Sequence, residues 1–302
     1  MRELLSKLIC DSAKEDPNFI ALSGDHGYAL FDAIRRERPE QFLNAGVAEQ
    51  AMIGCAAGLC RVGFKPLVYG LAAFVPTRVL EQIKLDLCLS KLNVTLLGDG
   101  AGIVYTTLGA SHHSAEDLAA LRALPNLMIF SPCDSEELEI CYREAREYDG
   151  PAYIRIGKGD RPKVHTEKLT STRPHVLVAS SHSKACIIST GSMVSVAVAI
   201  ARKFGIAAIS VPRIKPFDAE IGGLASSYGT AFVIEEHSRY GGLSSSLAEF
   251  FCERAGRHPR IRTLSLEDKF AHLCGSYQYA MSEHGMADEQ IMARIEAMLK
   301  EL

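Results

Sequence analysis

The sequence predicts an α/β protein made of two three-layer α/β/α domains with mainly parallel sheets. Short apolar segments alternate with longer amphipathic segments along the whole chain, a pattern typical of parallel strands that helices cover on both faces. A length of 302 residues is enough for about two domains. The stretch 158–175 is polar, contains two prolines and has no apolar period. We therefore expect domains over 1–160 and 176–302, joined by a linker over 161–175.

The expected elements follow from these segments in order. Residues 1–16 place apolar side chains at helical spacing among charged ones, which predicts an amphipathic helix and not a signal peptide. Short apolar runs then predict strands, and longer amphipathic segments predict helices. The expected strands are 19–25, 65–70, 93–100, 127–132, 151–157, 185–191, 207–212, 230–236 and 260–266. The expected helices are 49–62, 75–90, 134–148, 193–204, 243–256 and 288–300.

Composition and charge exclude several classes of protein. The 33 basic and 36 acidic residues leave a net charge of −3 without any block of like charges, so no nucleic-acid partner is expected. No apolar run approaches the ~20 residues of a membrane span, so no membrane partner is expected. The nine cysteines form no CxxC pair, which favours reduced thiols over zinc knuckles or disulfides. We expect a cytoplasmic protein.

Candidate functional residues follow the expected strands, because ligands of parallel sheets bind beyond the carboxyl ends of the strands. Asp25 and His26 follow the first strand, and the segment around Phe74 follows the second. Glu49 opens a helix that is rich in small residues. An acid at that position is either a first-turn residue stabilised by the helix dipole or a buried acid that exchanges a proton with a heterocycle. The residues alone leave both interpretations open.

Two adjacent histidines, His112 and His113, precede an expected helical segment. Neighbouring side chains point in different directions and no third ligand has the right spacing, so a shared metal is not expected. Either the pair is solvated or one histidine carries protons in catalysis. Ser114 and Asp117 fit a helix-capping pattern.

Two glycine-containing segments predict turns rather than sites. The GDG string at 98–100 with Asn126 literally matches a metal–diphosphate motif, but Asn126 precedes the next strand instead of following it. A glycine turn at a strand end is therefore expected there. The glycine pair at 241–242 could let the backbone approach a ligand, although turn chemistry is the simpler interpretation. We expect no metal ligand from this chain.

Six segments of the chain form an ordered set: NAGVAEQ, AAFVPTRVLEQI, GASHHSAEDLAALRALPN, SPCDSEEL, GPAYIRIGKGD and VIEEHSRYGGL. In this order they resemble the pyrimidine-binding and C-terminal domains of transketolase, and the resemblance spans nearly the whole chain. The diphosphate-binding domain of that family, with its metal motif, has no counterpart here. The resemblance therefore implies the C-terminal subunit of a split transketolase.

The resemblance implies roles for individual residues. Glu49 would be the acid that hydrogen-bonds N1′ of the aminopyrimidine of thiamine diphosphate, and Phe74 the ring that stacks on it. Asp25 would be an acid that faces the reaction channel and the cofactor. His112 would handle hydroxyl protons of the ketose donor and the aldehyde acceptor. The implied substrate-binding residues are Arg2, His26, Arg78, His112 and His113.

The resemblance also implies a cofactor and a partner. The cofactor would be thiamine diphosphate, with Mg²⁺ or Ca²⁺ held by an N-terminal subunit that carries the diphosphate-binding domain. The particle would be a heterotetramer whose active sites form between subunits. The reaction would move a two-carbon ketol unit from a ketose donor to an aldose acceptor, with small sugars or sugar phosphates as substrates.

Three positions depart from the family pattern. Leu108 stands where the family has an acid that contacts the acceptor's C2 hydroxyl. A second phosphate-binding arginine is replaced around Gly157, beside Lys158, and Ala29 is the nearest match to a phosphate-binding serine. A hydroxyl loses a hydrogen-bond partner when the acid becomes leucine, so we expect substrates other than the standard pentose phosphates.

Three other functions stay open at this stage. The β subunit of a 2-oxo acid dehydrogenase decarboxylase has the same two-domain plan and an equivalent glutamate. A fragment of a 1-deoxyxylulose 5-phosphate synthase is a further enzyme. A non-catalytic scaffold of the same fold belongs to a different class, but it would need none of Glu49, Phe74 and His112.

Overall fold

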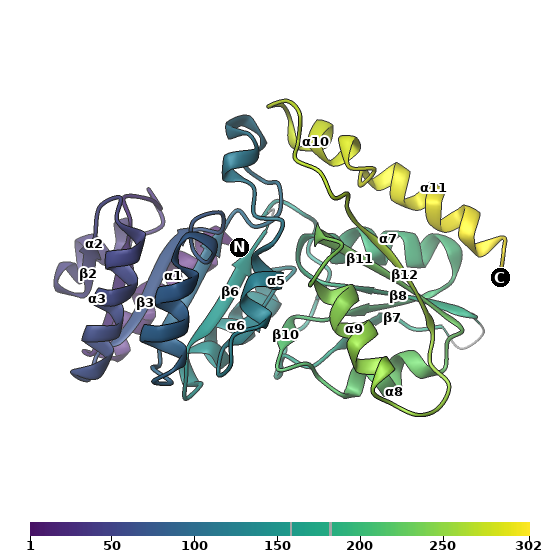
Figure 1. The fold of residues 1–302 in the computed structure, drawn as a ribbon. Coiled ribbons are helices and arrows are strands. Elements are labelled where there is room, and N and C mark those ends of the chain that lie inside the picture. Colours follow the sequence, from purple (N-terminus) through teal and green to yellow (C-terminus); the bar gives the residue numbers. More distant parts are fainter. Residues whose placement is uncertain (158, 181–182) are drawn as a thin grey trace.

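The computed structural model describes residues 1–157, 159–180 and 183–302, and it contains two sheets that lie side by side with helices around them (Figure 1). The first sheet runs, in spatial order, β10 (Arg213–Lys215), β5 (Met128–Phe130), β6 (Ala152–Ile156), β4 (Thr95–Asp99), β3 (Lys65–Leu71), β1 (Phe19–Ser23) and β2 (Phe42–Asn44). The second runs β12 (Arg260–Leu266), β11 (Thr230–Ser238), β8 (Ala185–Ser189), β9 (Ala207–Ser210) and β7 (His175–Val178).

The expected fold class is confirmed. Among the described strands, every pairing is parallel except β10 with β5 and β7 with β9. Each of the nine expected strands forms, and β2, β7 and β10 are additional. The helices are α1 (Arg2–Glu15), α2 (Asp32–Glu37), α3 (Glu49–Arg61), α4 (Leu80–Gln82), α5 (Asp117–Arg122), α6 (Ser135–Glu147), α7 (Val194–Phe204), α8 (Glu220–Ser226), α9 (Leu243–Cys252), α10 (Tyr277–Glu283) and α11 (Asp288–Leu299).

The segment 75–90 is helical, but it is not the regular α-helix that was expected. The segment starts as a short 3₁₀ turn (Thr77–Val79), continues as α4 and ends as a π-helical stretch (Ile83–Cys88). Val75, Val79, Ile83 and Leu87 are all fully buried. These buried side chains recur every four residues, whereas one turn of an α-helix takes 3.6 residues, so in a regular α-helix the row would rotate away from the core. The wider π-helical turn keeps the row facing the core.

The polar stretch after the first sheet is not a simple exposed linker. His165 and Thr172 are buried within it, and β7 already begins at His175. One strand from the C-terminal half, β10, also joins the first sheet, where Arg213 pairs with Phe130. Polar composition does not reveal this burial, because the ring of His165 bonds to Asp134 and the hydroxyl of Thr172 donates to Glu144 inside the fold.

The apolar core continues from one sheet to the next. One cluster includes Val68 and Leu96 of the first sheet together with Ile188 and Val233 of the second, and two further clusters cover the remaining faces. The two sheets therefore pack as one body. No helix in the described part of the chain has the length and apolar character needed to cross a membrane.

Candidate active site

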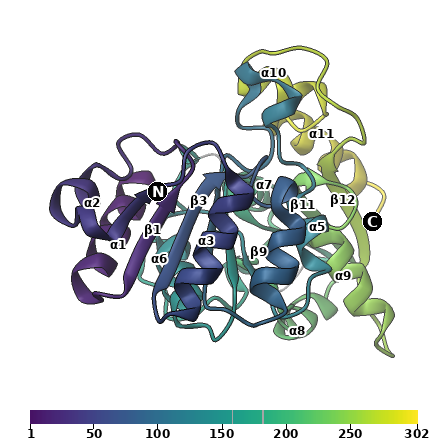
Figure 2. The ribbon, with the colours of Figure 1, turned by 60° about the vertical axis from the view of Figure 1, so that its left-hand side comes forward.

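Four of the predicted site residues come together at the carboxyl ends of the first sheet's strands. Glu49 begins α3, Phe74 lies in the turn after β3, and Arg78 lies in the next turn of that segment. His112 comes from the loop after β4, which projects from the sheet toward α10 (Figures 1 and 2). Parallel strands bring such loops to one end of a sheet. We call these four residues the glutamate cluster.

Glu49 is a buried acid as well as a first-turn residue. Its side chain is 4% exposed, and Oε2 accepts a hydrogen bond from Arg78 Nη1 at 3.0 Å. The second oxygen, Oε1, is buried and has no hydrogen-bond partner among the described residues. Because a buried acceptor without a donor costs free energy, this oxygen is suited to an N–H group of a ligand.

Phe74 presents an aromatic face beside this acid. The guanidinium carbon of Arg78 lies 4.2 Å from the centre of the Phe74 ring. The His112 ring lies 5.2 Å from the Phe74 ring at 66°, and the His26 ring lies 6.3 Å away. The planar guanidinium of Arg78 thus lies over the Phe74 ring and donates N–H to Glu49. An aminopyrimidine makes these same two kinds of contact, so the cluster fits that group.

The two adjacent histidines have different surroundings. His112 faces Phe74, and its Nδ1 lies 3.0 Å from Ser111 Oγ. His113 lines a separate cavity of about 480 Å³ together with His284. Burial lowers the pKa of both His113 and His284. His112, and not His113, therefore belongs to the glutamate cluster, and the pair does not converge on one ligand.

Two other predicted site residues lie apart from the glutamate cluster in their described contacts. Asp25 is exposed, has a left-handed φ of 61°, and accepts a hydrogen bond from Asn44 Nδ2 at 3.3 Å. Arg2 donates to the backbone oxygen of Tyr28 at 2.5 Å and lines a separate cavity of about 210 Å³. Lys158 lies outside the described residues.

The GDG string forms a strand-end turn, as expected. The carboxylate of Asp99 accepts hydrogen bonds from the hydroxyls of Tyr69 at 2.6 Å and Tyr105 at 3.3 Å. The side chain of Asn126 instead donates to the backbone oxygen of Cys88 at 3.0 Å. The two halves of the literal motif therefore have different partners.

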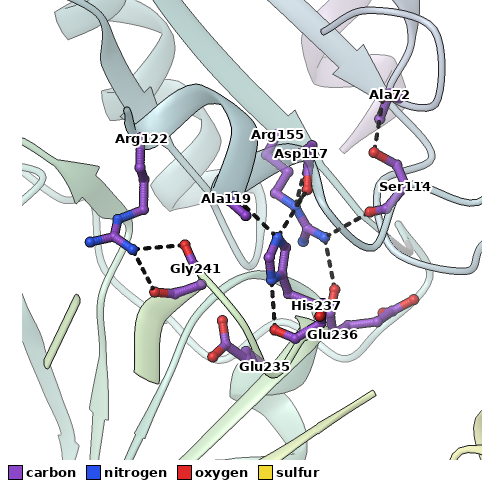
Figure 3. A network of polar contacts seen from close by, with 12 residues as sticks. Ala72, Ser114, Asp117, Ala119, Arg122, Arg155, Glu235, Glu236, His237 and Gly241 are labelled. Atoms are coloured by element: carbon purple, nitrogen blue, oxygen red, sulfur yellow. Dashed lines mark hydrogen bonds and ion pairs between the residues drawn. The ribbon is translucent and has the colours of Figure 1, made fainter. Parts of the chain in front are cut away.

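The predicted cap by Ser114 and Asp117 is wrong. Asp117 is fully buried and accepts from Arg155 Nε at 2.9 and 3.0 Å and from the Tyr153 hydroxyl at 2.9 Å (Figure 3). The Ser114 hydroxyl donates to the backbone oxygen of Ala72 at 2.9 Å. A buried guanidinium requires a buried carboxylate, and this requirement outweighs the modest gain of a helix cap.

The end of β11 contributes Glu236, which the sequence pattern places among the polar residues that follow the expected strands but does not assign to the site. Glu236 is 2% exposed, and its carboxylate accepts from the backbone N–H of Ile103 at 3.0 Å, the Ser192 hydroxyl at 2.5 Å and the Tyr277 hydroxyl at 2.6 Å. Its backbone oxygen accepts from Arg155 Nη2 at 2.7 Å (Figure 3). Charged residues at the end of an otherwise apolar strand were the available signal.

The turn after β11 is also held by charged groups. The carboxylate of Glu235 accepts from the backbone N–H groups of Leu243 and Ser244, at 2.6 and 2.9 Å, at the start of α9. The backbone oxygen of Gly241 accepts from Arg122 at 2.8 Å (Figure 3). The glycine pair at 241–242 is therefore turn structure, as expected, and it lies at the contact between the two sheets.

Family comparisons divide the chain into two matched regions. Residues 1–163 match the model described as "Transketolase, pyrimidine binding domain". Residues 175–290 match the model described as "Transketolase, C-terminal domain".

Individual relatives match over most of their length. The chain is 34% identical over 262 residues to a subunit of the apulose-4-phosphate transketolase of Phocaeicola vulgatus, covering 83% of each chain. It is 29% identical over 299 residues to a 6-deoxy-6-sulfo-D-fructose transketolase subunit of a Clostridium species, covering 97% of this chain and 92% of that one. A solved split-gene transketolase, described as an inactive beta4 tetramer, superposes with a TM-score of 0.87 at 30% identity over 99% of this chain and 98% of the other.

Proposed function

Because the chain belongs to the transketolase family, as a counterpart of the C-terminal subunits of split transketolases, we propose that it transfers a two-carbon ketol unit from a ketose donor to an aldose acceptor. The observation that carries the proposal is the buried, unpaired Oε1 of Glu49 beside the face of Phe74. The same matches favour this function over that of a 2-oxo acid dehydrogenase subunit or a scaffold.

Thiamine diphosphate, when bound, supplies the carbanion chemistry of such a transfer. Glu49 offers a buried oxygen for an N–H or a proton of the aminopyrimidine, and burial makes that contact stronger than it would be in water. Phe74 offers the stacking face. Arg78 holds the second oxygen of Glu49 and keeps the acid oriented. These contacts support binding of the aminopyrimidine of the cofactor, but they do not provide a site for its diphosphate.

His112 is the proposed proton carrier for substrate hydroxyls. Its ring is half-buried and lies 5.2 Å from the ring of Phe74, so it adjoins the face proposed for the aminopyrimidine. Ser111 can orient the imidazole through Nδ1. His26, whose Nε2 is buried without a hydrogen-bond partner in the described part of the chain, is the proposed second substrate contact.

The remaining assignments concern the assembly. We propose that a partner subunit with the diphosphate-binding domain supplies the ligands of Mg²⁺ or Ca²⁺, and that the two chains form a heterotetramer. Asp25, Arg2 and His113 remain proposed cofactor- or substrate-binding residues, which would need the partner to complete their sites. Leu108 supports the expectation that the enzyme prefers substrates other than the standard pentose phosphates, because leucine cannot hydrogen-bond the acceptor's C2 hydroxyl.

The first experiment is to purify the tagged chain from its source cells and assay the eluate for thiamine diphosphate and for a second chain. Stoichiometric recovery of both supports the split enzyme. Ketol transfer is then measured over a panel of phosphorylated and unphosphorylated donors and acceptors. Recovery of this chain without partner or cofactor, combined with no ketol transfer, overturns the proposal. Highest turnover with xylulose 5-phosphate and ribose 5-phosphate overturns the unusual specificity alone.

A further inference from the structure

A buried group of potential metal ligands lies away from the glutamate cluster. Glu137 lies in the first turn of α6, Cys133 lies two residues before that helix, and His165 comes from the segment between the two sheets. Their exposed fractions are 5%, 0% and 7%. One sulfur, oxygen or nitrogen ligand atom from each lies within 4.8 Å of the other two. We call these three residues the thiol cluster.

His165 is oriented as metal-binding histidines are. Its Nδ1 lies 3.0 Å from Asp134 Oδ2 and 3.9 Å from Cys133 Sγ, and Asp134 Oδ2 also accepts the backbone N–H of His165 at 3.0 Å. A proton on Nδ1 leaves the lone pair on Nε2. That nitrogen is buried, has no hydrogen-bond partner within the described ranges, and lies 3.7 Å from Glu137 Oε1. In metal sites, a binding histidine usually donates the N–H of one ring nitrogen to a carboxylate, and its other ring nitrogen binds the metal.

The ligand set selects the class of ion. A thiolate, an imidazole and a carboxylate together suit Zn²⁺, which binds four ligands tetrahedrally. Mg²⁺ and Ca²⁺ prefer oxygen ligands and are not expected here. We propose that Cys133, Glu137 and His165 bind one zinc-class divalent cation at the junction of the two sheets. The fourth position goes to water or to His175, whose ring centre lies 5.4 Å from that of His165.

Binding of the ion would release protons. A divalent cation binds the thiolate form of Cys133 and the neutral imidazole of His165, so protons on these groups are displaced to solvent, and the ion compensates the buried negative charge. The affinity of the cluster should therefore rise with pH.

The thiol cluster also connects the two halves of the chain. Glu137 Oε1 accepts the hydroxyl of Ser210 at 2.5 Å, and Ser210 ends β9 in the second sheet. The backbone N–H of Cys133 donates to the other oxygen of Glu137 at 2.8 Å. An ion bound here would hold α6, the intersheet segment and β9 together, so we expect it to stabilise the fold and not to take part in ketol transfer.

A protonated His165 is the competing explanation of the same geometry. Burial opposes its protonation, but the hydrogen bond to Asp134 and the charge of Glu137 raise the pKa of His165 above its ordinary value. An imidazolium between two carboxylates would then stabilise the fold without any metal. The two explanations differ in their dependence on the thiol of Cys133.

Cobalt titration of the full chain separates them. A background with Ser at the exposed Cys55, Cys252 and Cys274 removes competing thiols. After treatment with a chelator, this protein should bind one equivalent of Co²⁺ with a thiolate-to-cobalt charge-transfer band, and Zn²⁺ should displace the cobalt. Cys133→Ser should abolish the band. Cys141→Ser, which removes a fully buried thiol within α6, is the matched control and should retain it.

Two outcomes of the titrations above overturn the proposal. One is the absence of a charge-transfer band in the folded background protein, with no rise in Tm on adding Zn²⁺. The other is a band that survives Cys133→Ser. If that variant fails to fold, His165→Gln is titrated instead, and a weakening of Co²⁺ binding by at least about tenfold is expected. Unchanged Co²⁺ affinity in His165→Gln also overturns the site. The readout is spectroscopic, so it does not depend on ketol transfer.

Discussion

The carboxylate of Glu236 accepts the backbone N–H of Ile103 at 3.0 Å, and this bond connects the second sheet to the base of the loop that carries His112. The loop is closed by an antiparallel bridge between Gly102 and Ser114. A Cβ on Gly102 would lie 2.4 Å from Glu236 Oε1, so glycine is needed for this close approach. The second sheet thus positions a proposed catalytic residue that lies on the first.

Replacing Glu236 should therefore impair ketol transfer without removing any group from the glutamate cluster. Glu236→Gln keeps the shape of the side chain but leaves one acceptor oxygen in place of two, so the Ile103 N–H competes for it with the hydroxyls of Ser192 and Tyr277. We expect kcat to fall about tenfold and the affinity for thiamine diphosphate to change less than about twofold. Steady-state kinetics and a cofactor titration of the complex with its partner measure both.

The matched control is Ser192→Ala, which removes one donor to Glu236 but leaves the Ile103 bond in place. Its kcat should fall less than that of Glu236→Gln. Equal losses in the two variants, or a large loss of cofactor affinity in either, would show that Glu236 does not act by positioning the loop.

Glu49→Gln should abolish activity while leaving assembly intact. Glutamine can still accept a hydrogen bond from Arg78, so the helix start keeps its packing, but the side chain can no longer exchange a proton. The loss of an acid–base group predicts a decrease in kcat of about 10²–10⁴-fold. The complex is assayed for ketol transfer, for subunit stoichiometry and for Tm. Gln50→Ala, at the exposed neighbouring position, should stay active, and turnover surviving in Glu49→Gln would contradict the assigned mechanism.

The ion pair between Arg78 and Glu49 should contribute little to stability, because the Arg78 side chain is 46% exposed and solvent screens the interaction. A double-mutant cycle of Arg78→Met and Glu49→Gln, followed by urea unfolding, should give a coupling free energy below about 1 kcal/mol. Arg78→Met should nevertheless lower kcat/KM, because it loses contacts to both Glu49 and Phe74. A coupling of several kcal/mol would mean that the pair is structural.

Stability should fall when the pH drops below the ordinary histidine range. His237 donates from Nδ1 to the backbone oxygen of Ser238 and accepts at Nε2 from the backbone N–H of Ala119, so it is neutral in the fold. Burial lowers its pKa. As the pH falls, His237 therefore takes up a proton in the unfolded chain before it does so in the folded chain. The free energy of unfolding that is present above pH ~6.5 is lost as the pH falls through the lowered pKa of the folded state.

Urea midpoints measured between pH ~7.5 and ~5.5 check this dependence. The variant His237→Gln should be less stable at the higher pH and should lose less stability on acidification than the unaltered chain. The exposed His258→Gln is the control and should keep the original slope. An unchanged slope in His237→Gln would exclude this histidine as a source of acid sensitivity.

Leu108 should determine how the enzyme treats the acceptor's C2 hydroxyl. The residue lies in the same loop as His112 and is 52% exposed, so a polar replacement is tolerated. Leu108→Asp should raise the preference for an acceptor with a C2 hydroxyl over its 2-deoxy analogue by about tenfold in kcat/KM. Leu108→Ala removes the side chain without adding an acceptor and should not change the ratio. Equal ratios in all three proteins would contradict the assignment.

Part of the candidate site could be read directly from the sequence. Glu49, Phe74, Arg78 and His112 each follow a strand or open a helix, and parallel topology brings such positions to one end of a sheet. His113 shares the loop of His112 but faces another cavity, because adjacent side chains diverge. Asp25 also follows a strand, yet its turn leaves it exposed. Sequence position therefore predicted the loop but not the direction of each side chain.

The sequence by itself determined the alternation of strands and helices, the parallel sheets and the family, since these depend on local apolar patterning and on short ordered motifs. Only the tertiary structure decided that Asp117 pairs with Arg155, that Glu236 supports the loop base and that Cys133, Glu137 and His165 meet. Most of these partners are far apart along the chain, and a charged side chain looks the same in the sequence whether it is solvated or buried. Its partner is fixed by the packing that excludes water, because a buried charge must then find its counterpart within the fold.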